Sequence, residues 1–241
     1  MNQLLKPGLS IVIPIFNESE NIKLFFDKLE EFHQLAKFNF NFILVDGCSS
    51  DETPEIILRE IKSRSIQNVD LLPMEHRNGY GYDIMQGLLK SKYDVLAWTH
   101  ADLQTDLLDL IKAYEIFLAS SNEVIVKGKR HNRAILERIF TFGMQIFTFI
   151  YLKEYLDDIN AQPKLFSRNF YEKHLKQNPP KDFSLDLFCL LKAKLNNIQI
   201  QTFQVNFRPR EAGVAKGGGG SWKNRIMLVK RTIKYILATK T

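Results

Sequence analysis

The residues best suited to chemistry follow an apolar run near the middle of the chain. His100, Asp102 and Gln104 come directly after Val95–Trp98, a run with the length and composition of a buried strand. A carboxylate there, with a carbonyl-bearing side chain two residues later, suits a divalent cation that also binds phosphate oxygens. A diphosphate leaving group needs such a cation, because negative charge develops on it. The plain alternative is a solvated loop.

Two other apolar runs also end in polar or aromatic residues. Pro14, Phe16, Asn17 and Glu18 lie at the end of the first run, and Asp46 follows the second. An aromatic ring can cover a nucleobase, a glutamate can accept a hydrogen bond from a ribose hydroxyl, and an aspartate can accept one from the N–H edge of a base. The structural alternatives are a helix cap after the first strand and a capping turn after the second.

Basic residues supply candidates for phosphate binding, namely Arg130, Lys164, Arg208, Arg210 and Lys216. Arginine can hold a phosphate with two parallel hydrogen bonds, whereas lysine acts as a mobile point charge. Most basic side chains in proteins are merely solvated, so these residue types alone do not assign a site.

Strands and helices alternate through the first hundred residues. Strand-like runs occupy residues 9–15, 40–45, 69–72 and 94–98, and helical spacing occupies 18–32, 49–62 and 82–89. Asn17 is expected to cap the first helix, with Glu20 three positions on. The alternation predicts an α/β fold, with a mainly parallel central sheet flanked by helices. Ligands gather at the carboxyl ends of such strands, where Asp46 and Asp102 lie.

The second half of the chain is less regular. We expect extended segments at 124–127, 164–166 and 198–207, and helices at 134–152 and 184–195. Residues 213–220 include five glycines, and a basic helix is expected from Trp222. Because no repeat or linker interrupts the chain, we expect one composite domain over 1–216, followed by a glycine-rich loop and a basic amphipathic helix at 217–241.

The composition is that of a globular protein with an anionic partner. Of 241 residues, 45% are hydrophobic and 25% charged, and the net charge is +6. The basic residues do not alternate with aromatics in a nucleic-acid-binding motif, so we expect no nucleic acid partner. Two cysteines far apart, Cys48 and Cys189, and a start without secretory features predict a cytoplasmic protein. The longest uncharged stretch, 139–152, is shorter than the about 20 residues that span a membrane.

Seven motifs occur in a fixed order from about residue 10 to residue 216: IPIFNESENI, FILVDGCSSDET, RNGYGYDIMQGL, HADLQ, KGKR, DINAQPKLF and VNFRPREAGVAK. Together they resemble the motifs of glycosyltransferase family 2, in the branch of the dolichol-phosphate mannose synthases and related polyprenyl-phosphate sugar transferases. Each motif is modest, but the ordered set is strong. The final motif resembles FxxRxxGxSK, with Arg210 and Lys216 at the matching separation.

This resemblance implies a GT-A fold, in which a nucleotide-sugar half, about 1–120, merges with an acceptor half, about 121–216. It implies an inverting transfer from a UDP- or GDP-sugar that is bound by Pro14, Phe16, Asn17, Glu18, Asp46, His100, Ala101, Asp102 and Arg130. It also implies Mg²⁺ or Mn²⁺ at Asp102, Gln104 and His100. The phosphates are then expected at Arg130, Arg210 and Lys216.

Three positions depart from the family pattern. His100 replaces the first aspartate of the metal motif, and a neutral imidazole suits Mn²⁺ better than Mg²⁺. Gly47 replaces the second aspartate of the DDGS segment, which changes the contacts to the base or ribose. Lys164 stands where the family has an arginine, so the charge stays but the planar fork is lost.

The nature of the acceptor divides the mechanism. A polyprenyl phosphate, the favoured acceptor, is anionic near pH 7 and attacks without a base, with Lys164 and Arg208 expected to hold it. A sugar hydroxyl, as in cell-surface polysaccharide or lipopolysaccharide synthesis, needs a base, for which Asp186 and Asp158 are the candidates. Asp102 is the third residue expected to take part in catalysis. A third alternative, motivated by His100, is a non-catalytic member that only binds the nucleotide sugar.

Two segments predict contact with a membrane surface. Residues 134–152 are rich in aromatics, and the terminal helix combines an apolar face with basic positions, among them Lys223, Lys230, Arg231 and Lys234. Basic amphipathic helices often lie in the lipid interface. We therefore expect a peripheral protein at the cytoplasmic face, or one with a membrane-protein partner. The alternative is that both segments pack on the protein's own core.

Overall fold

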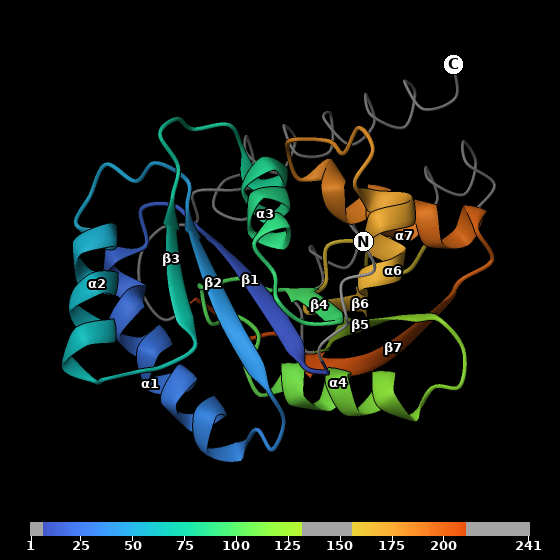
Figure 1. The fold of residues 1–241 in the computed structure, drawn as a ribbon, viewed down its shortest axis with the longest axis horizontal. Helices are drawn as coiled ribbons and strands as arrows, with labels where there is room; N and C mark the ends of the chain where they lie inside the picture. Colours follow the sequence, from blue (N-terminus) through green and yellow to red (C-terminus); the bar gives the residue numbers. More distant parts are fainter. Residues whose placement is uncertain (1–6, 132–155, 211–241) are drawn as a thin grey trace.

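A seven-stranded mixed sheet forms the centre of the molecule (Figure 1). The computed structural model describes residues 7–131 and 156–210. Along the sheet the strand order is β3-β2-β1-β4-β6-β5-β7. The strands are β1 (Leu9–Ile15), β2 (Phe40–Asp46), β3 (Val69–Pro73), β4 (Val95–Trp98), β5 (Val124–His131), β6 (Lys164–Ser167) and β7 (Gln199–Asn206). All strands run parallel to β1 except β6, which is antiparallel to both of its neighbours.

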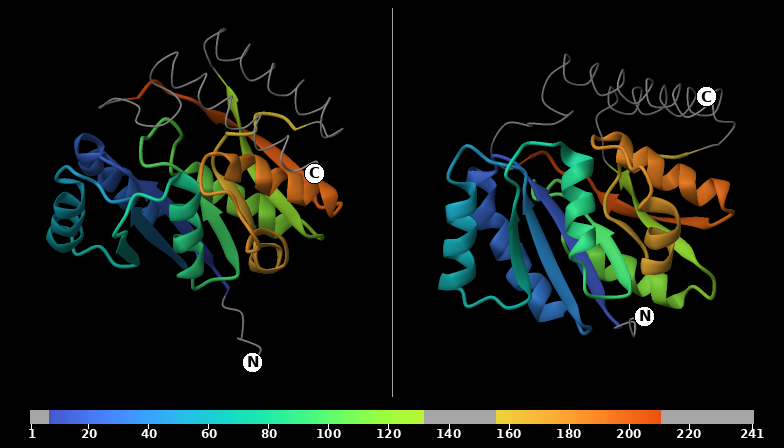
Figure 2. Two further views of the ribbon diagram at one scale, coloured as in Figure 1. Left: turned by 90° about the horizontal axis from the view of Figure 1, so that it is seen from above. Right: turned by 45° about the horizontal axis from the view of Figure 1, so that its top comes forward.

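Helices cover both faces of this sheet. They are α1 (Ser19–Leu35), α2 (Thr53–Ser63), α3 (Tyr80–Leu89), α4 (Asp109–Ala119), α6 (Arg168–Phe170) with the π-helical turn η1 (Tyr171–Leu175), and α7 (Ser184–Leu195). Figure 2 shows α3 and α7 on one side of the sheet, with α1 and α4 on the other.

Alternation along the strands decides which face each helix covers. In β1, Ile11 and Ile13 pack with α1, α2 and α4, whereas Val12 between them packs with α3 and α7. Successive side chains of a strand point to opposite faces, so a strand buried on both sides reads as one continuous apolar run. Two apolar cores therefore lie on either side of one sheet.

The strand order fixes where a ligand can bind. The chain builds β1, β2 and β3 outward in one direction and then returns to place β4 on the other side of β1. At such a reversal, two neighbouring loops diverge to opposite faces and leave room between them. Because β6 is antiparallel, residue Lys164 at its start lies at the same edge as the carboxyl ends of the other strands.

The predicted elements are confirmed in type and order wherever the structure describes them. The predicted cap of the first helix and the start of the second are wrong, and the third helix begins at Tyr80, two residues before its predicted start. Glu18, not Asn17, precedes the first turn of α1, and no side chain caps that turn. The Asn17 side chain instead accepts a hydrogen bond from the Ser50 N–H at 2.8 Å. The second helix begins at Thr53 rather than at Ser49 or Ser50, because residues 48–52 form a loop in which Cys48 has a φ of 65°.

The expectations for residues 134–152, for 217–241 and for Lys216 lie outside the described residues. Helix α4, α6 and the turn η1 were not expected. In the part of the chain that the structure describes, no helix has both the length and the apolar character needed to cross a bilayer.

Candidate active site at the carboxyl edge of the sheet

Loops from four strands meet at the carboxyl edge of the sheet. The loops after β1 and β2 are joined where the backbone N–H of Asn17 donates to the Ser49 hydroxyl at 2.8 Å. The segment after β7 is joined to the loop after β4, because the Arg208 N–H donates to the Gln104 carbonyl at 2.8 Å. The Gln104 side-chain amide returns a bond to the Arg208 carbonyl at 3.3 Å. Segments distant in sequence thus form one site.

Arg210 links the two acidic loops on either side of the β1–β4 reversal. Its guanidinium donates two hydrogen bonds to the Glu18 carboxylate, at 3.0 and 2.8 Å, and a longer one to Asp102 at 3.5 Å. The Asn21 amide supports the same glutamate at 2.6 Å. Although burial opposes the charged form of Arg210, these carboxylates raise its pKa. A permanent cation therefore sits where the sequence predicts the diphosphate.

The loop after β4 holds the predicted metal ligands together. Leu103 has a φ of 56°, unusual for a residue with a side chain, and the Gln104 N–H donates to Asp102 Oδ1 at 3.2 Å. His100 Nδ1 lies 4.0 Å from Asp102 Oδ2. On the other side of the ring, His100 Nε2 is 3.0 Å from the hydroxyl of Tyr80. The turn and the tyrosine together orient the imidazole towards the carboxylate.

These residues fit a divalent cation that shares its coordination with phosphate. A cation with ligand distances of about 2.0–2.2 Å can reach two ligand atoms about 4 Å apart. Mg²⁺ usually takes only one or two protein ligands when phosphate oxygens complete its shell. The described residues contain no group of three or more His, Cys, Asp or Glu side chains that would hold a metal ion. The side chain of Gln104, the third predicted ligand, donates to the Arg208 carbonyl instead, so the fit depends on His100 and Asp102 acting with a phosphate-bearing substrate.

The loop after β1 presents an aromatic surface. The guanidinium of Arg77 lies 3.7 Å from the centre of the Phe16 ring. Pro14 pairs with Val45 in the sheet, is half-buried and lies two residues before Phe16. Asp46, at the end of β2, accepts a hydrogen bond from the Ser49 N–H at 3.1 Å. This is the corner of the site where the sequence predicts a nucleobase.

Lys164 and Asp186 form a fully buried ion pair at 2.5 Å. The same carboxylate oxygen accepts hydrogen bonds from the Trp98 indole at 3.2 Å and from the Gln162 amide at 3.0 Å. Lys164 also donates to the Ala161 carbonyl at 3.0 Å. Both charges are thus paired with each other inside the protein, where the two side chains are 0% and 2% exposed.

Arg130 and Asp158 form a second paired set. The guanidinium donates to both carboxylate oxygens, and the Arg130 backbone N–H adds a bond at 2.8 Å. Asp158 is completely buried. The arginine expected at the phosphates and the aspartate offered as a base therefore bind each other.

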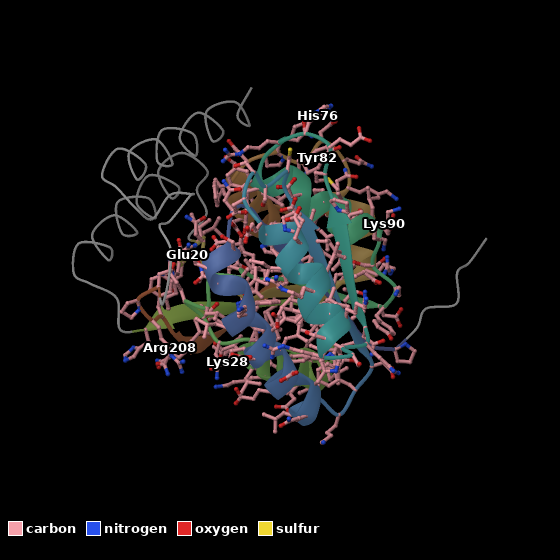
Figure 3. All side chains as sticks on the ribbon, turned by 90° about the vertical axis from the view of Figure 1, so that its left-hand side faces the viewer. Glu20, Lys28, His76, Tyr82, Lys90 and Arg208 are labelled. Atoms are coloured by element: carbon pink, nitrogen blue, oxygen red, sulfur yellow. The ribbon has the colours of Figure 1, made fainter. Side chains whose placement is uncertain are left out.

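Arg208 differs from the other predicted cations because its side chain is half exposed, 3.6 Å from Asp106. Figure 3 shows it on the same side of the molecule as Lys28 of α1. Ala101, between the two metal-loop residues, is buried and contributes backbone and packing only. Arg208 is thus the predicted acceptor-phosphate residue that remains accessible.

Several residues of this site were not predicted. Tyr80 stacks on Phe183 at 4.3 Å and joins His100 to Gln162, whose amide lies 3.3 Å from the tyrosine hydroxyl. Burial raises the pKa of Tyr80 well above its usual range, so the phenol stays protonated. The neighbouring Asp186 carboxylate adds to this effect. The sequence signal was a tyrosine directly between the two glycines of the third motif.

Comparisons with known proteins identify the family of this chain. The sequence model of the family described as "Glycosyl transferase family 2" matches residues 10–175. A dolichyl-phosphate beta-glucosyltransferase from Dictyostelium discoideum is 24% identical over 95% of this chain and 75% of the relative. A bactoprenol glucosyl transferase from Shigella phage SfX is 24% identical over 89% of this chain and 68% of the relative.

Solved structures show the same fold. A glucosyl-3-phosphoglycerate synthase from Mycobacterium tuberculosis, in complex with Mn²⁺ and UDP, superimposes with a TM-score of 0.73 at 12% identity, covering 97% of this chain and 79% of that one. A mannosyltransferase from Pyrobaculum calidifontis, in complex with GDP-Man and Mn²⁺, gives 0.64 at 16% identity, covering 95% and 61%. The expected GT-A fold is confirmed. The chain is a glycosyltransferase that belongs to glycosyl transferase family 2.

Proposed function

We propose that this enzyme transfers a hexose, with inversion, from a nucleoside diphosphate sugar to a polyprenyl phosphate. One observation carries the choice of acceptor: both aspartates offered as bases, Asp158 and Asp186, are buried in ion pairs with Arg130 and Lys164. A sugar hydroxyl must lose a proton during attack, whereas a phosphate near pH 7 is already an anion. The names of the two curated relatives support the same acceptor class.

The reaction needs only positioning and charge stabilisation. An oxygen of the acceptor phosphate attacks the anomeric carbon as the bond from that carbon to the donor diphosphate breaks. The bonding electron pair leaves with the nucleoside diphosphate, and no proton has to be removed. Arg210 would bind the diphosphate, and the accessible Arg208 would bind the incoming acceptor phosphate.

His100 and Asp102 would hold Mg²⁺ or Mn²⁺ together with the diphosphate. When bound, the cation neutralises the charge that develops on the leaving group. Tyr80 keeps His100 turned towards Asp102, and Gln104 shapes the loop through its backbone N–H. Because one of the two protein ligands is an imidazole, we expect Mn²⁺ to support transfer better than Mg²⁺.

The acceptor also implies a place of action. A polyprenyl chain is anchored in a lipid bilayer, so we infer that the enzyme works as a peripheral protein at the cytoplasmic face of a membrane. The aromatic segment 134–152 and the basic segment 217–241 are the parts of the sequence suited to that contact. A membrane-protein partner is the other arrangement that brings the site to the lipid.

The test is a transfer assay with purified protein, UDP-glucose or GDP-mannose, a polyprenyl phosphate and each metal ion, with the glycolipid product read by mass spectrometry. Asp102→Asn should lower turnover by about 100-fold or more, because it removes charge beside the leaving group. Asp70→Asn, at an exposed aspartate of β3 paired with Lys92, is the matched control and should leave turnover unchanged.

Two outcomes would overturn the proposal. Transfer to a sugar hydroxyl but not to a polyprenyl phosphate would show that the acceptor class is wrong. Donor binding without turnover, with any acceptor and either metal, would leave a protein that only binds nucleotide sugars.

A further inference from the structure

The space that a side chain at position 47 would occupy is filled by another residue. The φ of Gly47 lies outside the left-handed region, so the backbone there accepts any residue. A Cβ atom at this position would lie 2.6 Å from Asp83 Oδ2 and 3.4 Å from both Asp83 Cγ and the Ile15 carbonyl. The obstacle is therefore a carboxylate that reaches the end of β2 from helix α3.

Asp83 and Asp46 form a buried pair of carboxylates at this point. They are 5% and 3% exposed, respectively, and the Oδ1 atom of each has no hydrogen-bond partner among the described residues. Burial, and then the charge of Asp46, raise the pKa of Asp83 to about 7, while Arg77 lowers it. Leaving such groups unsatisfied costs stability, which is typical of sites that a ligand completes.

The surroundings of the pair indicate which ligand completes it. Asp46 lies opposite Ile15 in the sheet, so the Phe16 ring and its Arg77 partner follow directly beside it. The Gly47 N–H donates to the Ile15 carbonyl at 2.8 Å and fixes this corner. A flat ring surface beside buried hydrogen-bond acceptors suits a nucleoside, which offers base N–H groups and ribose hydroxyls.

We propose that Asp83 serves as the second carboxylate for binding the donor nucleoside, taking the space of a side chain at position 47 and acting together with Asp46. This inference rests on the proposed function, because it concerns the donor of that reaction. It also accounts for Gly47: a side chain there and a carboxylate at position 83 exclude each other. Because the pKa of Asp83 is raised to about 7, its carboxyl group can donate as well as accept a hydrogen bond near neutral pH, as the edge of a base with adjacent C=O and N–H groups requires.

The test exchanges the two positions. Affinities for UDP and GDP, with Mn²⁺, are measured by titration calorimetry for the wild type, Asp83→Ala, Gly47→Asp and the double variant. Inorganic pyrophosphate with Mn²⁺ probes the phosphate end alone. Asp70→Ala, at an exposed aspartate, is the matched control.

Asp83→Ala should weaken binding of the preferred nucleoside diphosphate about tenfold or more, with unchanged pyrophosphate binding. It should also raise the melting temperature, because it removes an unsatisfied buried carboxylate. Gly47→Asp should bind the same nucleoside diphosphate at least as weakly as Asp83→Ala does, because its Cβ would collide with Asp83 Oδ2. In the double variant only the Ile15 carbonyl contact at 3.4 Å remains, and binding should return to within about threefold of the wild type.

The outcomes separate this inference from the proposed function. If the wild type binds and transfers sugar but Asp83→Ala binds nucleotide equally well, only the role of Asp83 is wrong. A double variant no better than its weaker parent would also overturn that role. If the wild type binds neither UDP nor GDP, both proposals fail together.

Discussion

Arg210 and a divalent cation would compete for the same carboxylate. The guanidinium reaches both Glu18 and Asp102, and its contact with Asp102 is the longer at 3.5 Å. A metal ion at Asp102 would therefore displace the weaker contact first and leave Arg210 held by Glu18. A diphosphate would then meet the arginine on one side and the cation on the other. The geometry thus supports ordered assembly of metal and donor around one residue.

Asp83 should make stability depend on pH. Its pKa of about 7 in the fold exceeds its ordinary value of 3.8 because of burial and Asp46, so between these values the folded state binds the extra proton. The free energy of unfolding should therefore fall as pH rises from about 4 to 7 and level off above. Asp83→Asn should flatten this fall when urea unfolding is followed at each pH.

Part of that pH dependence will persist in the variant. Burial, and then the charge of Asp106, raise the pKa of Asp109 to about 6, which adds a slope of the same sign. Asp109→Asn is therefore the companion measurement. An Asp83→Asn profile parallel to that of the wild type over the whole range would show that Asp83 is ionised in the folded protein.

Single residues were predictable where chemistry follows directly from a strand end. Glu18 and Asp102 lie together as their positions after two neighbouring strands imply. The pairing of Lys164 with Asp186 was not predictable, because 22 residues separate them and only the packing of α7 against the sheet brings them together. Whether a basic residue meets a phosphate or an internal carboxylate is decided by such long-range contacts.

At the scale of elements, continuous apolar runs and helical spacing predicted the strands and helices of the first half. Helix α4 was missed although Leu110 and Ala113, three positions apart, are buried on one face of it, as helical spacing predicts. Asn17 was assigned as a helix cap, yet the fold uses it to join two loops. Local pattern therefore indicates that an element exists, while the partner of a polar side chain depends on topology.

Helix α3 lies close to the sheet because Gly87 has no side chain. A Cβ there would meet Val12 Cγ1 at 2.4 Å and Val45 Cγ2 at 2.9 Å, on two central strands. Alanine favours a helix by about 1 kcal/mol over glycine, but overpacking a core costs about 1–3 kcal/mol. Because a contact at 2.4 Å is far too short, the overpacking cost should lie at about 2–3 kcal/mol, and Gly87→Ala should lower the free energy of unfolding by about 1–2 kcal/mol in urea.

Leu89→Ala, on the same helix but with half of its side chain exposed, is the control and should stay within about 0.5 kcal/mol of the wild type. A Gly87→Ala variant as stable as the wild type would mean that α3 can move away from β1 and β2. Because α3 carries Tyr80 and Asp83, donor affinity should fall together with stability.

At the scale of the molecule, one sheet joins the two halves that the sequence predicts. Strand β6 bridges them by pairing with β4 on one side and β5 on the other, so the donor loops and the segment after β7 share one edge. Under the proposed function, the acceptor phosphate would have to reach that edge while its polyprenyl chain stays in the bilayer. The edge would then face the membrane, which makes binding to anionic lipid a test of the whole arrangement.

In a flotation gradient, we expect the full chain to rise with vesicles that contain anionic phospholipid and to stay at the bottom when the vesicles are neutral. Replacing four basic residues of the terminal segment by glutamine should lower vesicle binding at least tenfold, since each basic residue near an anionic surface contributes about 1 kcal/mol. These are Lys223, Lys230, Arg231 and Lys234. A control variant loses equal charge at exposed lysines of the described surface, namely Lys37, Lys92, Lys173 and Lys176.

Two results would contradict a specific role of the terminal segment. If both variants lose vesicle binding equally, net charge alone attracts the protein. If the wild type does not bind anionic vesicles, the lipid has to be presented by a membrane-protein partner.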